Sequence, residues 1–181
     1  MPSRIFLLGP DQWDDDYRPP IPAPVKAVLG SLSGPYQPRH LRLAAASMLA
    51  EDSGRRRTGV VMDPSSQWPG EDEADFFRRL EVECLVDAYF IVLPARAKLL
   101  GTVFEGGMLV RDFHFGRNPK IVLFVEESVI QPDARGRFEF VAKGKRTRYL
   151  RSLVIRAEHV VVWNRVERLL ASIVDYADLD P

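Results

Sequence analysis

The sequence predicts one α/β domain over residues 1–181, built on a doubly wound, five-stranded parallel sheet. Five short apolar runs alternate with segments of helical periodicity, which is the pattern of repeated strand–helix–strand units. The runs are almost continuously apolar, as expected for strands that are covered on both faces. We expect the flavodoxin-like strand order 2-1-3-4-5, which places a ligand outside the carboxyl ends of strands one and three.

The N-terminal segment supplies the first strand and a long loop. Residues 5–8 form an apolar run that Gly9-Pro10 ends, which predicts a short buried strand. The segment 11–37 is rich in Pro, Asp and Gly, so we expect mostly loop, with a short helix over 25–29 after Pro24. A loop this long in a compact domain is usually functional or mobile.

Two helices and the second strand follow. Apolar residues at helical spacing predict a helix over 40–51, which Ser53-Gly54 ends. The apolar run 59–62 ends at Asp63-Pro64 and predicts the second strand. An acidic first turn, followed by apolar residues at helical spacing, predicts a helix over 71–85.

The same patterns complete the fold. They predict strands over 88–93, 121–125 and 159–163, and helices over 102–113 and 166–176. The segment 126–157 is less regular and carries a turn signal at 133–136. We interpret it as an insertion between strands four and five, containing a β-hairpin with a basic surface.

Composition and charge narrow the classes of function. Hydrophobic residues make up 46% and charged residues 28% of the chain, as in ordinary globular domains. The formal net charge is zero, which makes nucleic acid an unlikely partner and fits a homodimer or higher homo-oligomer. The single Cys84 excludes an intramolecular disulfide. No apolar run approaches the ~20 residues of a membrane span, and the first run is short for a signal peptide, so we expect a cytoplasmic protein.

The predicted strand order places the candidate site at three loops. They contribute Gly9, Pro10, Asp11, Gln12 and Trp13 after strand one, Asp63 after strand two, and Gly101, Thr102 and Glu105 after strand three. Gly9 and Gly101 allow backbone to approach a ligand closely. Trp13 or Tyr17 could stack on a planar ring.

Glu105 is the candidate catalytic residue because it falls in the first turn of the helix predicted over 102–113. A helix N-terminus favours the ionised carboxylate, which can attack a sugar carbon or stabilise an oxocarbenium-like transition state. Glu81, on the preceding predicted helix, is the candidate second acid. The structural alternative stays open for both: an acid that only complements the helix dipole, and an acid on a solvated helix face.

Other patterns carry less information. The sequence has no Gly-x-Gly-x-x-Gly, Walker or Gly-x-Ser-x-Gly motif, so dehydrogenase, kinase and serine hydrolase functions lack support. His40, His114 and His159 do not have metal-ligand spacing. We interpret the basic cluster over 135–151 as the solvated surface of a hairpin. The functional alternatives are that it binds a phosphate, an acidic partner or RNA.

Four segments, in chain order, resemble the nucleoside 2-deoxyribosyltransferase-like superfamily. Residues 5–10 resemble its opening strand and Gly-Pro turn, and residues 87–93 resemble its third strand. Gly101-Thr102-Val103-Phe104-Glu105-Gly106-Gly107 is similar to its Gly-Thr-x-x-Glu-x-Gly motif, and residues 116–124 resemble the strand that follows. The Gly-Thr-x-x-Glu part also resembles a motif of the cytokinin-activating phosphoribohydrolases.

The resemblance implies cleavage of the N-glycosidic bond of a nucleoside or nucleoside 5′-monophosphate, with the sugar transferred to a base or to water. It implies that Glu105 is the nucleophile and that Glu81 orients the sugar or assists proton transfer. It also implies a homo-oligomer and no metal or organic cofactor. The alternative is a non-catalytic nucleotide-binding, sensor or interaction protein with the same fold.

Overall fold

A computed structural model describes residues 3–52, 58–62, 87–98, 120–135, 137–141 and 154–178 of this chain. Its strands are β1 (Ser3–Leu8), β2 (Thr58–Met62), β3 (Ala88–Leu93), β4 (Lys120–Glu126), β5 (Ile130–Pro132), β6 (Phe138–Phe140) and β7 (His159–Trp163). Its helices are α1 (Ala23–Leu29), α2 (Arg39–Asp52), the short 3-10 helix η1 (Glu127–Val129) and α7 (Val166–Asp178). Each lies where the sequence predicts an element, or within the predicted insertion. The helices predicted over 71–85 and 102–113 lie outside the described residues.

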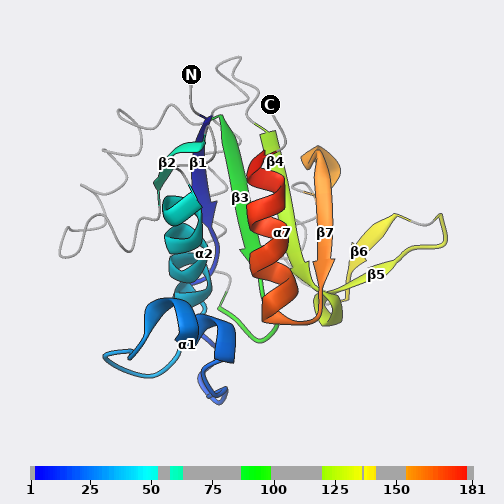
Figure 1. Ribbon diagram of the computed structural model, residues 1–181. Coiled ribbons are helices and arrows are strands. Elements are labelled where there is room, and N and C mark those ends of the chain that lie inside the picture. The colour runs from blue at the N-terminus through cyan, green and yellow to red at the C-terminus, as the bar shows by residue number, and fades with distance from the viewer. Residues whose placement is uncertain are drawn as a thin grey trace, which may run out of the picture.

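Five of these strands form a parallel sheet in the order β2-β1-β3-β4-β7 (Figure 1). Within it, β1, β3, β4 and β7 make a continuous parallel core, and β2 pairs with β1 at one edge. The α/β class and the parallel sheet are therefore confirmed. All five carboxyl ends lie along the same edge of the sheet, because the strands run in one direction.

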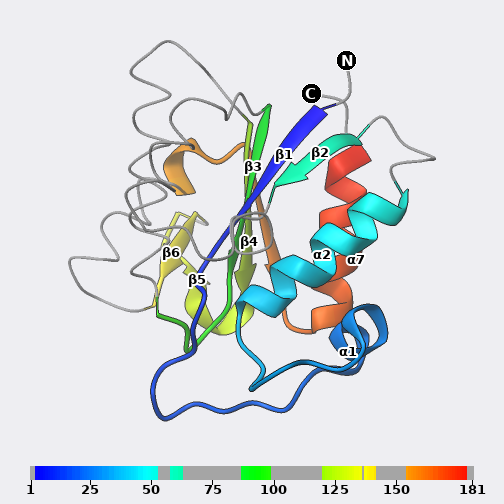
Figure 2. The same ribbon diagram turned by 90° about the vertical axis from the view of Figure 1, so that its left-hand side faces the viewer.

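Alternate residues of the strands supply two separate hydrophobic cores. Ile5, Phe90 and Phe124 pack with residues of α1, α2 and α7 on one face, which these three helices cover (Figure 2). Phe6 and Leu123 belong to the second core, on the other face, together with residues of β5 and β6. β3 is buried along its whole length and β4 at all but its two end residues, which explains why the apolar runs 88–93 and 121–125 are continuous.

An antiparallel β5–β6 pair lies between β4 and β7 in the chain, where the turn signal predicts a hairpin. Asp133 organises the turn, because its Oδ1 accepts hydrogen bonds from the N–H groups of Arg135 and Arg137, each at 2.8 Å. These bonds from Arg137 and Arg135 hold the pKa of Asp133 below its usual value. Ile130 and Phe140 attach the pair to the second core.

Among the described residues, no helix is long and apolar enough to cross a membrane.

Gly9 ends β1 with a backbone conformation that other residues adopt with strain, since its φ is +154°. A Cβ atom at this position would lie 2.5 Å from the Val92 carbonyl oxygen of β3. Only glycine therefore lets the chain leave β1 while staying in contact with the β3 backbone. This close approach sets the start of the loop at the carboxyl edge.

We predict that Gly9→Ala lowers the free energy of unfolding by about 3 kcal/mol, because the new methyl group meets backbone rather than a flexible side chain. Urea unfolding measures the change. Gly34→Ala is the matched control, since a Cβ there would meet nothing within 4 Å, and its effect should stay within about 0.5 kcal/mol. Equal effects of the two substitutions would contradict the role given to Gly9.

Candidate functional site at the carboxyl edge of the sheet

The loop after β1 and the loop after β3 pair with each other at the carboxyl edge. Trp13 and Ala97 form an isolated antiparallel bridge. The N–H of Asp14 donates to the carbonyl of Arg96 at 2.7 Å, and the N–H of Lys98 donates to the carbonyl of Gln12 at 2.8 Å. Residues 9–18 and 94–98, which we call the edge loops, thus form one hydrogen-bonded unit. This unit lies over β1 and β3, where the strand order reverses and α/β folds bind ligands.

Arg42, on α2, fastens the first edge loop to the helix layer. Its Nη1 donates to the carbonyl oxygens of Gly9 and Pro10, the latter at 2.8 Å, and its Nη2 forms a 2.5 Å ion pair with Asp11 Oδ1. The Arg42 side chain is 2% exposed, whereas that of Asp11 is 54% exposed. The loop therefore keeps a fixed path beneath a carboxylate that faces water.

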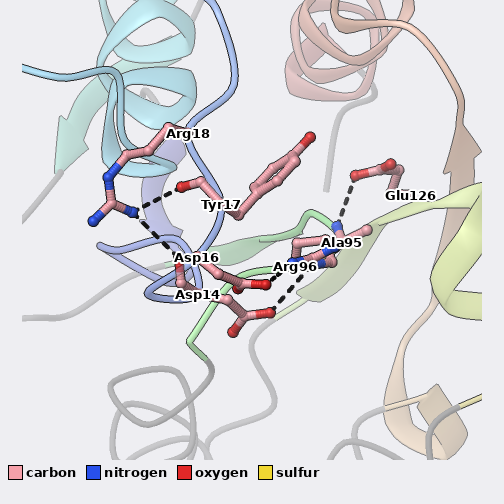
Figure 3. Close-up of polar contacts among 7 residues, drawn as sticks. All are labelled: Asp14, Asp16, Tyr17, Arg18, Ala95, Arg96 and Glu126. Carbon is pink, nitrogen blue, oxygen red and sulfur yellow. Dashed lines mark hydrogen bonds and ion pairs between the residues drawn. The ribbon is translucent and has the colours of Figure 1, made fainter.

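The acidic run Asp14-Asp15-Asp16 is paired with cations of the second edge loop. Figure 3 shows the pairs that Asp14 and Asp16 form with Arg96. Arg96 Nη2 lies 2.8 Å from Asp16 Oδ2, Arg96 Nε lies 3.6 Å from Asp14 Oδ2, and Lys98 Nζ lies 2.5 Å from Asp15 Oδ1. Arg96 adopts a left-handed φ of 59° and its guanidinium lies 5.0 Å from the centre of the Tyr17 ring. These exposed pairs add modest stability, but together they align the two loops.

Aromatic residues form a packed layer beneath the edge loops. Trp13 is buried, and its Nε1–H donates to the Tyr36 carbonyl at 3.0 Å. Its ring contacts Tyr17 edge-on at 5.3 Å and Tyr36 at 5.7 Å between centroids. Trp13 is therefore used in packing, whereas Tyr17 is half-buried and keeps part of its ring accessible. Of the two residues expected to stack on a planar ring, Tyr17 has the suitable exposure.

His40 is also part of this aromatic layer. It stacks on Tyr36 at 6.0 Å, and its Nδ1 accepts the Gln37 N–H at 2.8 Å, which requires an unprotonated Nδ1. Burial lowers the pKa of His40, and the neighbouring Arg39 acts in the same direction. Both effects favour a neutral imidazole, whose Nδ1 is already used by the Gln37 N–H, and they disfavour a role as a catalytic acid.

Glu126, at the carboxyl end of β4, joins the site although the sequence analysis did not select it. Its Oε2 accepts the Ala95 N–H at 2.7 Å (Figure 3). Its Oε1 accepts the Ser128 hydroxyl at 3.3 Å. Glu126 pairs in register with Trp163 of β7. The signal that could have identified it is the one used for the other loops: a polar residue directly after an apolar parallel strand.

The predicted site residues divide into two groups. The structure places Gly9, Pro10, Asp11, Gln12 and Trp13 together in the first edge loop, with Asp11 and Gln12 exposed. Those from later loops and helices lie outside the described residues: Asp63, Glu81, Gly101, Thr102 and Glu105. In the part of the chain that the structure describes, no group of three or more His, Cys, Asp or Glu side chains could hold a metal ion.

Comparisons of the chain with protein-family models, with curated proteins and with solved structures find no match.

We predict that Arg42→Met lowers the free energy of unfolding by about 3 kcal/mol, because two backbone carbonyls lose a buried charged donor. Arg39→Met, on the exposed side of the same helix, should change it by less than about 0.5 kcal/mol. Chemical denaturation of both variants provides the measurement. A loss below 1 kcal/mol for Arg42→Met would show that Arg42 does not fasten the loop.

The pairing of Asp16 with Arg96 predicts a pH dependence. Hydrogen bonding and attraction from Arg96 hold the pKa of Asp16 below its usual value. The pairing therefore favours the folded state fully above the ordinary Asp pKa, and this contribution is lost as the pH falls through the lowered value. In Arg96→Ala, NMR titration should show the pKa of Asp16 moving up toward the ordinary range.

Asp133 is the internal control for that titration, because its pKa is lowered by groups of the β5–β6 turn rather than by Arg96. Its titration should be the same in both proteins. An unchanged Asp16 pKa in Arg96→Ala would contradict the assigned ion pair.

Proposed function

We propose that this chain binds a nucleoside or nucleoside 5′-monophosphate at the edge loops and cleaves its N-glycosidic bond. The observation that supports this most is the pairing of the loop that follows the Gly9-Pro10 turn with the loop after β3 at the carboxyl edge. The two loops continue from residues 5–10 and 87–93, which are two of the segments that carry the resemblance to nucleoside 2-deoxyribosyltransferase-like proteins. The second loop leads, within the sequence, to the Gly-Thr-x-x-Glu segment that contains Glu105.

The proposal includes a complete flavodoxin-like fold. The parallel order β2-β1-β3-β4-β7 corresponds to 2-1-3-4-5 when only the parallel strands are numbered. A doubly wound sheet also needs helices on its second face, and we assign those to the segments 71–85 and 102–113 from their sequence pattern. The cytoplasmic location and the homo-oligomeric state remain part of this proposal.

In the proposed reaction, the Glu105 carboxylate attacks the anomeric carbon as the bond from that carbon to the base nitrogen breaks. The base leaves with the bonding electron pair and takes up a proton, for which Glu81 is the proposed donor or sugar-orienting residue. A second base or a water molecule then displaces Glu105 from the sugar. Gly101 and Thr102, which precede Glu105 in the sequence, are proposed to bind the substrate.

The edge loops contribute binding rather than proton transfer in this scheme. Asp11 is paired with Arg42, and Asp14 and Asp16 are paired with Arg96. These ion pairs suit carboxylates that hold loop geometry. The partly accessible Tyr17 ring offers a surface on which a base can stack.

A non-catalytic nucleotide-binding protein is the second candidate. The observation that favours it is the same set of ion pairs, because each carboxylate of the acidic run already has a cation partner. Such an edge can hold a ligand without a free acid or base among its described residues. The two candidates differ in whether the bound nucleoside is broken.

Chromatographic detection of free base separates them. The wild-type protein and Glu105→Gln would be incubated with a panel of nucleosides and 5′-monophosphates, with and without an acceptor base. We predict base release by the wild type and a loss of at least about 100-fold in Glu105→Gln, since a carboxamide is a poor nucleophile. Dependence on the acceptor distinguishes transfer from hydrolysis.

The folded state of Glu105→Gln is checked by its urea midpoint, which should match that of the wild type. Base release that is equal in the two proteins would refute the nucleophile. Binding without release from any panel member would favour the nucleotide-binding candidate.

A further inference from the structure

Two residues with polar side-chain groups are neighbours at the carboxyl ends of β4 and β7, on the face that α1, α2 and α7 cover. Glu126 and Trp163 are paired in register across these strands. Phe124 and Trp163 both belong to the core on this face. Side chains alternate along a strand, so Glu126, two residues after Phe124, starts from the same face. Neighbouring strands lie about 4.8 Å apart, which makes Glu126 and Trp163 direct neighbours.

Tyr17 and Tyr36 reach the same region from the loops. Both rings contact Trp13, at 5.3 Å and 5.7 Å between centroids. Burial raises the pKa of Tyr36, and the nearby Tyr17 and Glu126 act in the same direction. Figure 3 shows the Tyr17 hydroxyl and the Glu126 carboxylate on the same side of the Ala95–Arg96 backbone.

Trp163 carries a hydrogen-bond donor that its surroundings do not use. The residue is 5% exposed, and its Nε1–H has no acceptor among the described residues. Trp13, the other tryptophan in the described structure, donates its own Nε1–H to a backbone carbonyl at 3.0 Å. Buried donors are rarely left without an acceptor, so this indole is suited to a ligand that brings one.

We propose that Glu126 and Trp163 form a subsite for the hydrogen-bonding edge of a nucleobase. A carbonyl oxygen or ring nitrogen of the base accepts from Trp163 Nε1–H, and a neighbouring N–H of the base donates to the Glu126 carboxylate. Nucleobases present an acceptor and a donor side by side on one planar edge. This assignment rests on the proposed function, and names the group that identifies the substrate.

The surrounding chemistry separates a base from the other parts of a nucleotide. A phosphate would be repelled by the Glu126 carboxylate and could not donate to it. A sugar hydroxyl pair could also donate and accept. However, the partly accessible aromatic ring of Tyr17 favours contact with a flat π-system. The subsite is therefore assigned to the nucleobase. The sugar is tested separately, by titration with ribose and ribose 5-phosphate.

The indole N–H resonance of Trp163 reports occupation of the subsite directly. It is assigned in the ¹⁵N–¹H NMR spectrum by its disappearance in Trp163→Phe. Hypoxanthine, uracil, ribose and ribose 5-phosphate are then titrated separately into the wild-type protein. We expect the Trp163 resonance to move downfield with hypoxanthine or uracil and to stay in place with the two sugars. The indole N–H resonance of Trp13 should show no comparable downfield movement, since its hydrogen bond to Tyr36 is already made.

Affinity measurements test the two side chains separately. Calorimetry should show that Trp163→Phe and Glu126→Gln each weaken binding of the responding base about tenfold, the effect of one lost hydrogen bond. Glu127→Gln, the exposed neighbour of Glu126, should leave the affinity unchanged. If Trp163→Phe is unstable, the calorimetric comparison of Glu126→Gln with Glu127→Gln still tests the subsite.

The outcomes separate this inference from the proposed function. Base binding that depends on both residues supports the subsite even if no nucleoside is cleaved, in which case only the enzymatic proposal fails. A Trp163 shift with ribose but with neither base would overturn the base assignment. Absence of a shift with all four probes would overturn the subsite, whatever the result of the cleavage assay.

Discussion

The contact of buried Arg42 with the end of β1 is the interaction on which the carboxyl edge depends. One guanidinium group satisfies two backbone carbonyls and the Asp11 carboxylate, and it does so from a helix that is otherwise packed by small and apolar residues. Gly9 makes this geometry possible by removing the side chain that would meet β3. A buried cation with fewer acceptors would be strongly unfavourable, so loop and helix stabilise each other.

From the turn that Arg42 holds, a series of contacts continues along the carboxyl edge of the sheet. The first edge loop pairs by backbone and by charge with the second, and Glu126 fixes the second loop through the Ala95 N–H. Four segments from distant parts of the sequence thereby share one location. Rigid placement of ligand-binding loops on a parallel sheet is how α/β proteins prepare a site before a substrate arrives. The nucleoside proposal builds on this preparation.

Much of the described fold could be predicted from the sequence, because buried parallel strands are written as continuous apolar runs such as 88–93 and 121–125. The contacts that shape the site could not. Arg42 and Asp11 are 31 residues apart, and Arg96 and Asp16 are 80 apart, so their pairing follows only from the assembled sheet. From the sequence, Trp13 is a candidate for stacking on a ligand, but its packing in the aromatic layer under the loops buries it. Nothing in the pattern around Trp163 predicts a buried donor without an acceptor.

If the edge loops after β1 and β3 bind a nucleoside or nucleotide, titration with nucleosides and 5′-monophosphates should change the backbone amide NMR spectrum. We expect the largest chemical-shift changes at Gly9–Tyr17, Ala95–Lys98 and Glu126. Shifts confined to the β5–β6 hairpin, or no saturable shifts with any of these compounds, would contradict it.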